Sequence, residues 1–288
     1  MALETAFLTS GLPAEARLST ADSMARAVRD HDVEPAFVGL LGGEPVVGID
    51  RRGLERLAQS GRKLSTRDLP VAMVRGDDGG TTVAGTLFLA CRAGVAVTAT
   101  GGIGGVHPAG IPSGADTRAT AARDESADLI ELSRSPITLV CSGAKAILDL
   151  PATLERLDTL GVTVVGYGTE ELPAFWSAES GLRLSDSVVD ANEAAAVARE
   201  ARALGLRGAV LICVPPPPET ALPRDESERA VSRAVEEASA LGITGAALTP
   251  FLLGQIAEIT EGRSLRANVA LLENNAAVAA DIAVATAR

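Results

Sequence analysis

Short apolar runs that end at glycine alternate along this chain with longer, alanine-rich amphipathic segments. Short runs of Val, Ile and Leu are typical of strands buried on both faces, and the longer segments are typical of the helices that cover them. Two of these runs flank Gly42 and Gly43 at the spacing of a hairpin. The pattern predicts strands at Ala2–Leu8, Ala36–Leu41, Pro45–Ile49, Leu69–Val74, Val95–Thr100, Ile137–Cys141, Val162–Tyr167 and Ala209–Val214.

The helical segments complete the prediction of the fold. They are Thr20–Asp30, Gly53–Gln59, Thr81–Ala93, Asp124–Ser133, a helix directly after Lys145, Val188–Leu204, Glu226–Leu241, Thr249–Thr260 and Leu265–Thr286. Pro108–Ala122 is polar and contains Gly, Pro and Ser, which indicates a loop. Alternation of strand and helix predicts an α/β fold, an α/β/α sandwich with a mostly parallel central sheet. No repeat or linker divides it, so we expect a single domain over residues 1–288.

Composition narrows the function classes. A 47% hydrophobic content is enough for a packed core, and 2% aromatic residues mean that Ala, Val, Leu and Ile build it. The net charge of -11 repels phosphates, so we expect no nucleic acid polymer as a partner. The sequence shows neither a signal peptide nor an apolar run of membrane-spanning length, so we expect no membrane partner. Cys91, Cys141 and Cys213 lie far apart in apolar contexts and indicate reduced thiols in a cytoplasmic protein.

The chain contains only two lysines, Lys63 and Lys145, and every other basic side chain is arginine. A GC-rich genome explains the missing lysines but not the two that remain. Arginine cannot act as a neutral amine nucleophile, so a retained lysine is a candidate for amine chemistry. Lys145 closely follows a predicted buried strand, where desolvation favours the neutral amine that forms imines. The alternative is a surface lysine in the first turn of a helix, which the helix dipole disfavours.

A glycine-rich segment, Thr100–His107, follows another predicted strand. Glycines at this density allow a ligand to approach the backbone and leave N–H groups available to an anion, so we expect phosphate contact near His107. One alternative is a dinucleotide-binding loop, but Pro108 follows where that motif requires a helix. The other alternative is a tight turn that binds nothing.

Several other polar residues lie in predicted apolar elements. Asp124 and Asp128 are spaced to share one face of a helix, where they could bind Mn²⁺ or Mg²⁺ or simply form a solvated acidic first turn. Asn274 and Asn275 interrupt an apolar helix and need partners from a ligand or another helix. Glu4 lies in an apolar strand, where its pKa would be raised and it could carry a proton, unless it points into water.

Nine ordered segments carry sequence motifs: Ala2–Thr5, Arg62–Pro70, Gly79–Ala84, Ala99–His107, Ser126–Leu129, Val140–Leu150, Leu172–Phe175, Thr249–Leu253 and Glu273–Ala276. Each segment is weak evidence alone, but the ordered set runs from end to end and is highly specific. It resembles the pseudouridine-5'-phosphate glycosidase family, also known as the indigoidine synthase A-like proteins.

The resemblance implies a role for each candidate residue. Lys145 resembles the imine-forming lysine that attacks C1' of the ring-opened sugar, and Glu4 resembles the proton donor. Asp124 falls on the manganese-binding aspartate. The resemblance also implies a homotrimer of α/β/α sandwiches. Substrate contacts are expected at Lys63, Val83, Thr100, His107, Ser126, Ala127, Asp128 and one of Asn274 and Asn275.

The implied activity is cleavage or formation of the C–C glycosidic bond between ribose 5-phosphate and a base. In the cleavage direction, pseudouridine 5'-phosphate and water give uracil and ribose 5-phosphate. One alternative is a C-glycosynthase that attaches ribose 5-phosphate to a natural-product ring, and lesser ones are a non-catalytic sugar-phosphate-binding relative and a nicotinamide oxidoreductase. The loop 108–123 is longer than we expect for the family, so the base and the direction stay open.

Overall fold

Ten strands form one sheet at the centre of the computed structural model, which describes residues 1–60, 62–108, 124–243 and 248–288. The strand order is β4-β5-β2-β1-β6-β7-β10-β8-β9, with β3 paired to β2. The strands are β1 (Ala2–Leu3), β2 (Ala36–Leu41), β3 (Glu44–Val47), β4 (Lys63–Leu64), β5 (Gly79–Thr81), β6 (Val97–Ala99), β7 (Thr138–Cys141), β8 (Thr163–Tyr167), β9 (Ser187–Val188) and β10 (Val210–Cys213).

Most strand pairs are parallel, as the sequence predicted. β1 pairs in parallel with β2 on one side and β6 on the other, and the parallel ladder continues through β7, β10, β8 and β9. Both antiparallel pairs among the described strands involve β2, which pairs with β3 in the predicted hairpin and with β5. The carboxyl ends of β1, β6 and β7 therefore lie side by side at one edge of the sheet, where open α/β folds bind ligands.

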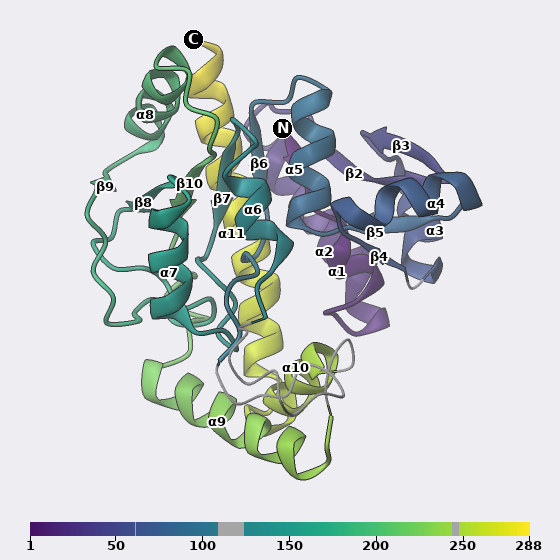
Figure 1. Ribbon diagram of the computed structural model, residues 1–288, viewed down its shortest axis with the longest axis vertical. Coiled ribbons are helices and arrows are strands. Elements are labelled where there is room, and N and C mark those ends of the chain that lie inside the picture. Colours follow the sequence, from purple (N-terminus) through teal and green to yellow (C-terminus); the bar gives the residue numbers. More distant parts are fainter. Residues whose placement is uncertain (61, 109–123, 244–247) are drawn as a thin grey trace.

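Helices cover both faces of the sheet (Figure 1), with α5, α6 and α7 on one face and α2, α8 and α11 on the other. α9 and α10 lie below the carboxyl edge. The helices are α1 (Ala6–Thr9), α2 (Ala14–Arg29), α3 (Arg51–Ser60), α4 (Leu69–Arg75), α5 (Val83–Arg92), α6 (Ala127–Leu132), α7 (Leu150–Thr159), α8 (Ala191–Ala203), α9 (Arg224–Ala240), α10 (Leu248–Ile259) and α11 (Arg263–Ala287).

The long helix α11 packs across β6 and β7 between α2 and α8. Among the described helices it alone has the length and apolar composition that crossing a membrane requires. Small residues such as Ala267, Ala276 and Ala280 are fully buried on it and let the helix approach the sheet closely. This packing gives α11 the place of a core helix, and it also carries Asn275 to the edge of the sheet.

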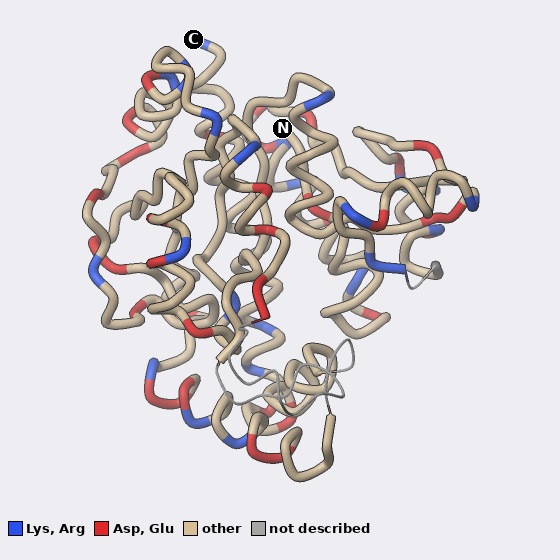
Figure 2. Tube along the Cα trace, viewed as in Figure 1, with Lys and Arg blue, Asp and Glu red and all other residues tan. Residues whose placement is uncertain are grey.

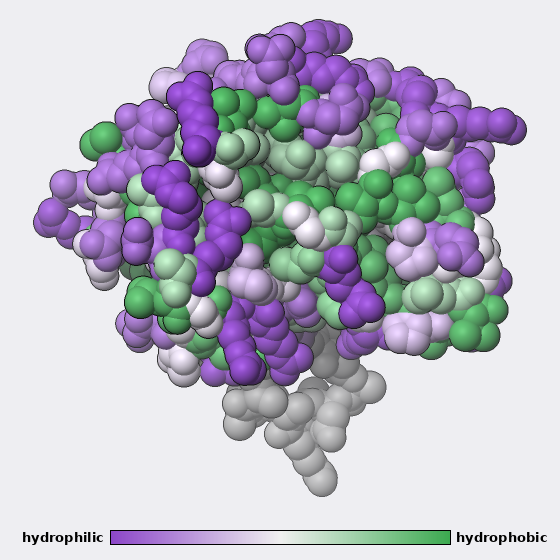
Figure 3. All heavy atoms as spheres, turned by 90° about the horizontal axis from the view of Figure 1, so that it is seen from above, coloured by the Kyte–Doolittle hydropathy of each residue, from purple (hydrophilic) through white to green (hydrophobic). Residues whose placement is uncertain are grey.

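Charges of both signs mix on the surface. Figure 2 shows Lys and Arg interspersed with Asp and Glu along α9, where Arg224–Glu228 and Arg229–Asp225 form ion pairs one turn apart, each at 2.7 Å. Figure 3 shows the molecule from above. Hydrophilic residues surround the outline of this face, and apolar residues lie between them. Exposed ion pairs contribute only about 0–1 kcal/mol each, so the buried aliphatic core holds the fold.

The prediction of a strand at Leu69–Val74 is wrong, because this segment forms helix α4. Pro70 occupies the first turn of the helix, where its missing N–H costs nothing, and Gly76 ends it in a left-handed conformation with φ 69°. Periodicity cannot distinguish a strand from a helix in such a short apolar run, whereas Pro70 at its start and Gly76 at its end favour a helix.

Three other boundaries differ from the prediction. The strand predicted over Ala2–Leu8 ends at Leu3 and gives way to α1. α6 begins at Ala127 and not at Asp124, because the side chain of Ser126 accepts the N–H of Asp128 as its cap. The helix expected directly after Lys145 begins only at Leu150, after Asp149 as its N-cap.

The remaining predicted elements agree with the structure apart from their ends. β4, β5 and β9 were missed because strands of two or three residues are too short to show a periodicity. Most of the predicted loop Pro108–Ala122 lies outside the described residues.

The turn after β7 can be tested at Gly143, which has φ 76° and whose added Cβ would lie 2.1 Å from the carbonyl oxygen of Pro173. Gly94 is a matched control with φ 75° and no atom within 4 Å of its added Cβ. We expect Gly94→Ala to cost about 1 kcal/mol of unfolding free energy from its positive φ. Gly143→Ala should cost about 1–3 kcal/mol more, because the clash forces the backbone to shift. Urea unfolding of both variants measures this, and equal costs would contradict the geometry.

Candidate active site

Three adjacent strands deliver Glu4, Thr100 and Lys145 to the carboxyl edge of the sheet. Glu4 directly follows β1 and Thr100 directly follows β6, while Lys145 lies four residues beyond the end of β7. The Thr100 hydroxyl donates a short hydrogen bond to Glu4 Oε2. The Glu4 N–H donates to the Ala99 carbonyl at 3.3 Å, and the Thr100 N–H donates to the Val140 carbonyl at 3.0 Å. The register of the sheet thus fixes the backbone positions of these residues.

The turn that carries Lys145 is attached to the glycine-rich segment. The Ile103 N–H donates to the Gly143 carbonyl at 3.0 Å, and the Lys145 N–H donates to the Ile103 carbonyl at 3.1 Å. These bonds form a parallel bridge between Ile103 and Ala144, which extends the β6–β7 pairing beyond the strands. Lys145 is half-buried there. Its backbone is therefore positioned by the sheet and not by a helix.

The charges of four side chains act on one another at this edge. Burial raises the pKa of Glu4, which is 8% exposed, and Asp128 adds to that rise, while Lys145, Thr100 and Lys63 oppose it. Lys63 is an exposed residue, but partial desolvation by nearby protein atoms lowers its pKa. The positive charge of Lys145 lowers it further. The expectation that Glu4 has a raised pKa is confirmed. A buried carboxyl of this kind can hold a proton for transfer.

Asp128 joins three segments of the site and is only 4% exposed. Its Oδ1 accepts the N–H of Ala84 and its Oδ2 accepts the N–H of Gly104, both at 2.8 Å. Val83, which is buried, begins α5 beside this contact. Ser126 caps the helix that carries Asp128, and Ala127 follows it. Lys63, Val83 and residues 126–128 therefore gather with Glu4, Thr100 and Lys145.

Asp124 lies on an extended segment beside His107. The His107 N–H donates to the Asp124 carbonyl oxygen at 2.9 Å, and Val106 and Glu125 form an antiparallel bridge next to it. The idea that Asp124 and Asp128 share a helix face is wrong, because the helix begins after Asp124 and both oxygens of Asp128 accept backbone N–H groups.

Of these two aspartates, Asp124 is the one whose carboxylate is available to a metal ion in the described part of the chain. The Asp124 carboxylate is exposed and accepts no hydrogen bond from the described residues. No group of three or more His, Cys, Asp or Glu side chains that could bind a metal occurs in the described ranges. A hard divalent cation that keeps most of its waters can be held by one such carboxylate, so Asp124 fits a water-rich Mn²⁺ or Mg²⁺ site.

The two asparagines of α11 differ in their surroundings. Asn275 is fully buried, and its Nδ2 donates to the carbonyls of Thr100 at 2.9 Å and Gly101 at 3.3 Å. Its side chain also exchanges hydrogen bonds with the Ser142 hydroxyl. It therefore ties the loops after β6 and β7 together, as an amide buried in an apolar helix must do to satisfy its polar atoms. Asn274 is half-buried and has no side-chain partner among the described residues.

Phe175 also lies at this edge of the sheet, although the chemistry of a phenylalanine side chain gives no reason to predict a role there. It has φ 63°, in a tight turn where Ala174 and Ser177 exchange backbone hydrogen bonds. Its N–H donates to the Ser142 carbonyl at 3.0 Å, and a Cβ on Gly102 would lie 2.7 Å from its ring. A bulky residue in this conformation costs about 1–3 kcal/mol and is typically retained at functional sites.

A family model matches nearly the whole chain. The model of the indigoidine synthase A-like proteins matches residues 1–285. A protein of Gemmatimonas aurantiaca named pseudouridine-5'-phosphate glycosidase is 50% identical over 287 residues, covering 99% of this chain and 90% of that protein. A protein of the same name from Chloroflexus aurantiacus is 48% identical over 290 residues, covering 99% and 92%.

Two solved structures share the fold. An indigoidine synthase A-like protein from Thermotoga maritima has a TM-score of 0.89 and 35% identity, covering 100% of this chain and 93% of that one. The prealnumycin C-glycosynthase AlnA, solved with ribulose 5-phosphate, has a TM-score of 0.87 and 35% identity, covering 99% and 90%. These neighbours confirm the predicted α/β/α architecture.

Proposed function

Because this chain belongs to the indigoidine synthase A-like family, we propose that it cleaves the C–C glycosidic bond of pseudouridine 5'-phosphate to give uracil and ribose 5-phosphate. The observation that carries this proposal is the meeting of buried Glu4, whose pKa is raised, with Lys145 beyond the ends of β1 and β7, the two strands that flank β6. A C-glycosidic bond has a poor leaving group, so it needs both a proton and an electron sink.

The first step opens the ribose ring. Glu4 donates its proton to the ring oxygen O4' as the C1'–O4' bond breaks. The neutral amine of Lys145 then forms a C–N bond to C1', and the proton released from nitrogen returns to Glu4. The raised pKa of Glu4 supports this role, because the carboxyl must be protonated to start the reaction.

The second step breaks the C–C bond. Glu4 gives the recovered proton to C5 of uracil, and the nitrogen lone pair forms C=N as the C1'–C5 bond breaks. Water then hydrolyses the iminium, which frees ribose 5-phosphate and Lys145. In the reverse direction the same residues join ribose 5-phosphate to a ring, and the likeness to the C-glycosynthase AlnA favours that as the second candidate function.

Sugar and phosphate are held by the segments that surround these two groups. Lys63 contributes positive charge. In the glycine-rich segment, the N–H groups of Gly101, Gly102 and Gly105 have no acceptor among the described residues and are available to the phosphate. Val83 and the cap of α6 at Ser126 close the same side, with Asp128 fixing their relative position. Asn274, whose amide has no partner in the described residues, faces the base.

The exposed carboxylate of Asp124 would hold a divalent cation, Mn²⁺ or Mg²⁺, and such an ion would supply positive charge beside the sugar phosphate. Three further features belong to the proposal. The enzyme forms a homotrimer, which light scattering on the intact protein measures. It acts in the cytoplasm, where its three free cysteines stay reduced. Its partners are ribose 5-phosphate and a base-like ring.

Replacement of Lys145 tests the nucleophile. We expect Lys145→Arg to lower uracil release from pseudouridine 5'-phosphate by about 10³-fold or more, because arginine keeps the charge but cannot form the imine. Borohydride treatment with ribose 5-phosphate should label the parent protein at Lys145 and leave this variant unlabelled by mass spectrometry. Lys63→Arg is the matched control and should still be labelled. Undiminished turnover of Lys145→Arg would contradict the mechanism.

Replacement of Glu4 separates its chemistry from its effect on stability. Since the pKa of Glu4 is raised in the folded state, its contribution to stability is greatest below the ordinary glutamate pKa of about 4.3 and is lost as pH rises through the folded value. Glu4→Gln should therefore raise the melting temperature at neutral pH but not at acidic pH, and lower turnover about 10²–10⁴-fold. A variant that is active, or less stable at neutral pH only, would contradict this role.

Two aspartates make a matched pair for the metal site. Asp128→Asn should cost about 1–3 kcal/mol of unfolding free energy, because an amide nitrogen cannot accept the backbone N–H that the carboxylate accepts. Asp124→Asn should change stability by less than about 0.5 kcal/mol but weaken manganese binding. Urea unfolding and manganese calorimetry measure both effects. Metal affinity lost in Asp128→Asn and retained in Asp124→Asn would contradict the assignment.

A further inference from the structure

Glu4 and Thr100 are neighbours on adjacent parallel strands. β1 and β6 pair Leu3 with Ala99, so Glu4 and Thr100 are the next residues along, and side chains at one register position lie on the same face of the sheet. The two side chains meet there, because the Thr100 hydroxyl donates to Glu4 Oε2. Thr100 is only 1% exposed, so the carboxyl supplies the acceptor that this buried hydroxyl needs.

The backbone of Thr100 is held by β7 on one side and by α11 on the other. Its N–H donates to the Val140 carbonyl at 3.0 Å, and its carbonyl accepts Nδ2 of Asn275 at 2.9 Å. Asn275 is fully buried and also exchanges hydrogen bonds with the Ser142 hydroxyl. The hydroxyl of Thr100 therefore reaches Glu4 from a fixed position.

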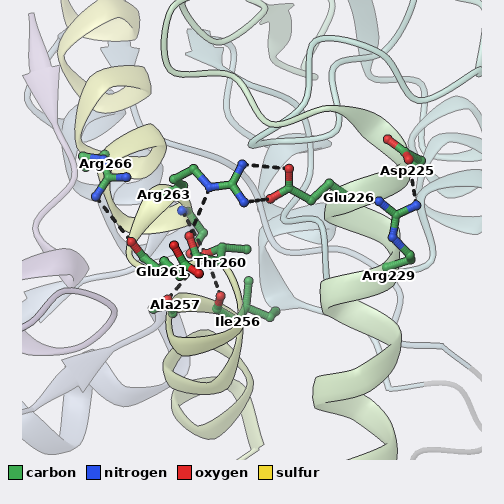
Figure 4. A network of polar contacts seen from close by, with 10 residues as sticks. Asp225, Glu226, Arg229, Ile256, Ala257, Thr260, Glu261, Arg263 and Arg266 are labelled. Atoms are coloured by element: carbon green, nitrogen blue, oxygen red, sulfur yellow. Dashed lines mark hydrogen bonds and ion pairs between the residues drawn. The ribbon is translucent and has the colours of Figure 1, made fainter.

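The start of α11, the helix that carries Asn275, is itself anchored to its neighbours (Figure 4). The Thr260 hydroxyl donates to the Ile256 carbonyl at 2.7 Å at the end of α10, and Arg263 pairs with Glu226 of α9 at 2.8 Å. Asn275 lies about three turns beyond Arg263. The amide that holds Thr100 thus belongs to a helix fixed at its first turn.

The two carboxyl oxygens of Glu4 have different surroundings. Oε2 accepts the hydrogen of the Thr100 hydroxyl, while Oε1 accepts no hydrogen bond from the described residues. A protonated carboxyl carries its hydrogen on one oxygen, and a hydrogen on Oε2 would face the one that Thr100 donates. The proton of Glu4 therefore resides on Oε1.

We propose that Thr100 is a positioning residue that holds Glu4 through Oε2 and so makes Oε1 the oxygen that exchanges protons with the substrate. The proposal rests on the proposed function, because it takes Glu4 as the acid. The O–H bond at Oε1 breaks as the bond from the proton to O4' forms, and Oε2 keeps its hydrogen bond from Thr100. The family resemblance implied a substrate contact for Thr100, whereas this role assigns its hydroxyl to Glu4.

The same hydrogen bond acts on the ionisation of Glu4. Burial is the largest influence and raises the pKa, while Lys145 beyond β7 lowers it. The hydrogen bond from Thr100 lowers the pKa too, because it favours the ionised carboxylate. Asp128 on α6 raises the pKa, and Lys63 on β4 lowers it. Removal of the hydroxyl leaves these three charged groups in place, so the pKa of Glu4 should rise.

Thr100→Val tests the proposal, because valine keeps the branched shape and removes the hydroxyl. Infrared difference spectra follow the protonated carboxyl of Glu4, whose band is absent from Glu4→Gln. We expect the band to persist to higher pH in Thr100→Val and to return to the parent's behaviour in Thr100→Ser. The alkaline limb of kcat/KM for uracil release should move to higher pH as well, because the reaction starts with protonated Glu4. kcat should fall about tenfold at nearly unchanged KM, because the carboxyl loses its fixed orientation.

Thr98 supplies a matched control on the same strand. It is fully buried, and its hydroxyl has no hydrogen-bond partner among the described residues. Thr98→Val should therefore leave kcat and the ionisation of Glu4 at the parent's values, with an equal or higher melting temperature. Thr100→Ala and Thr100→Ser differ only by the hydroxyl, and they repeat the comparison without a buried methyl group at this position.

The readouts separate this proposal from its rivals. Ionisation of Glu4 at the same pH in Thr100→Val and Thr98→Val would overturn it. A raised KM at unchanged kcat in Thr100→Val would overturn it too, because the hydroxyl would then bind the substrate. The infrared measurement needs no substrate. Absence of uracil release from the parent, together with the infrared shift, would therefore refute the proposed function and still support the hold of Thr100 on Glu4.

Discussion

The parallel pairing of β1, β6 and β7 is the constraint on which the site depends. These strands set Glu4, Thr100 and the Lys145 turn side by side, and each of the three follows its strand within a few residues. A slip of one residue in either pairing would move every side chain of the slipped strand to the other face. The hydrogen bonds that continue past the strands, from Ile103 to Gly143 and from Lys145 to Ile103, extend this register to the lysine itself.

Burial at that edge gives the site its chemistry. Glu4 is almost excluded from water, which raises its pKa, while the positive charges of Lys145 and Lys63 oppose that rise. Asp128 and Asn275 are buried too, but their side chains form hydrogen bonds with backbone groups. Glu4, Asp128 and Asn275 are thus similarly buried, but only the carboxyl of Glu4 has a raised pKa, while the other two side chains hold loops together.

Much of this could be predicted from the sequence, and the exceptions have physical causes. Apolar periodicity and glycine boundaries predict the parallel sheet and most helices, and the scarcity of lysine singles out Lys145 independently of the family resemblance. The predicted start of α6 is wrong because one capping side chain, Ser126, sets where the helix begins. Asp124 therefore lies outside the helix and does not share a helix face with Asp128. The positive φ of Phe175 arises only when distant segments pack together, so no local pattern in the sequence predicts it.

The central claim is that the sheet brings the amine of Lys145 to C1' of a ring-opened ribose 5-phosphate beside Glu4. A crystal structure of the protein with ribose 5-phosphate, reduced with borohydride before data collection, tests this most directly. The account predicts continuous density from Nζ of Lys145 to C1 of the sugar, with Glu4 next to that carbon. An intact cyclic sugar bound away from Lys145, with no bond to its nitrogen, would contradict it.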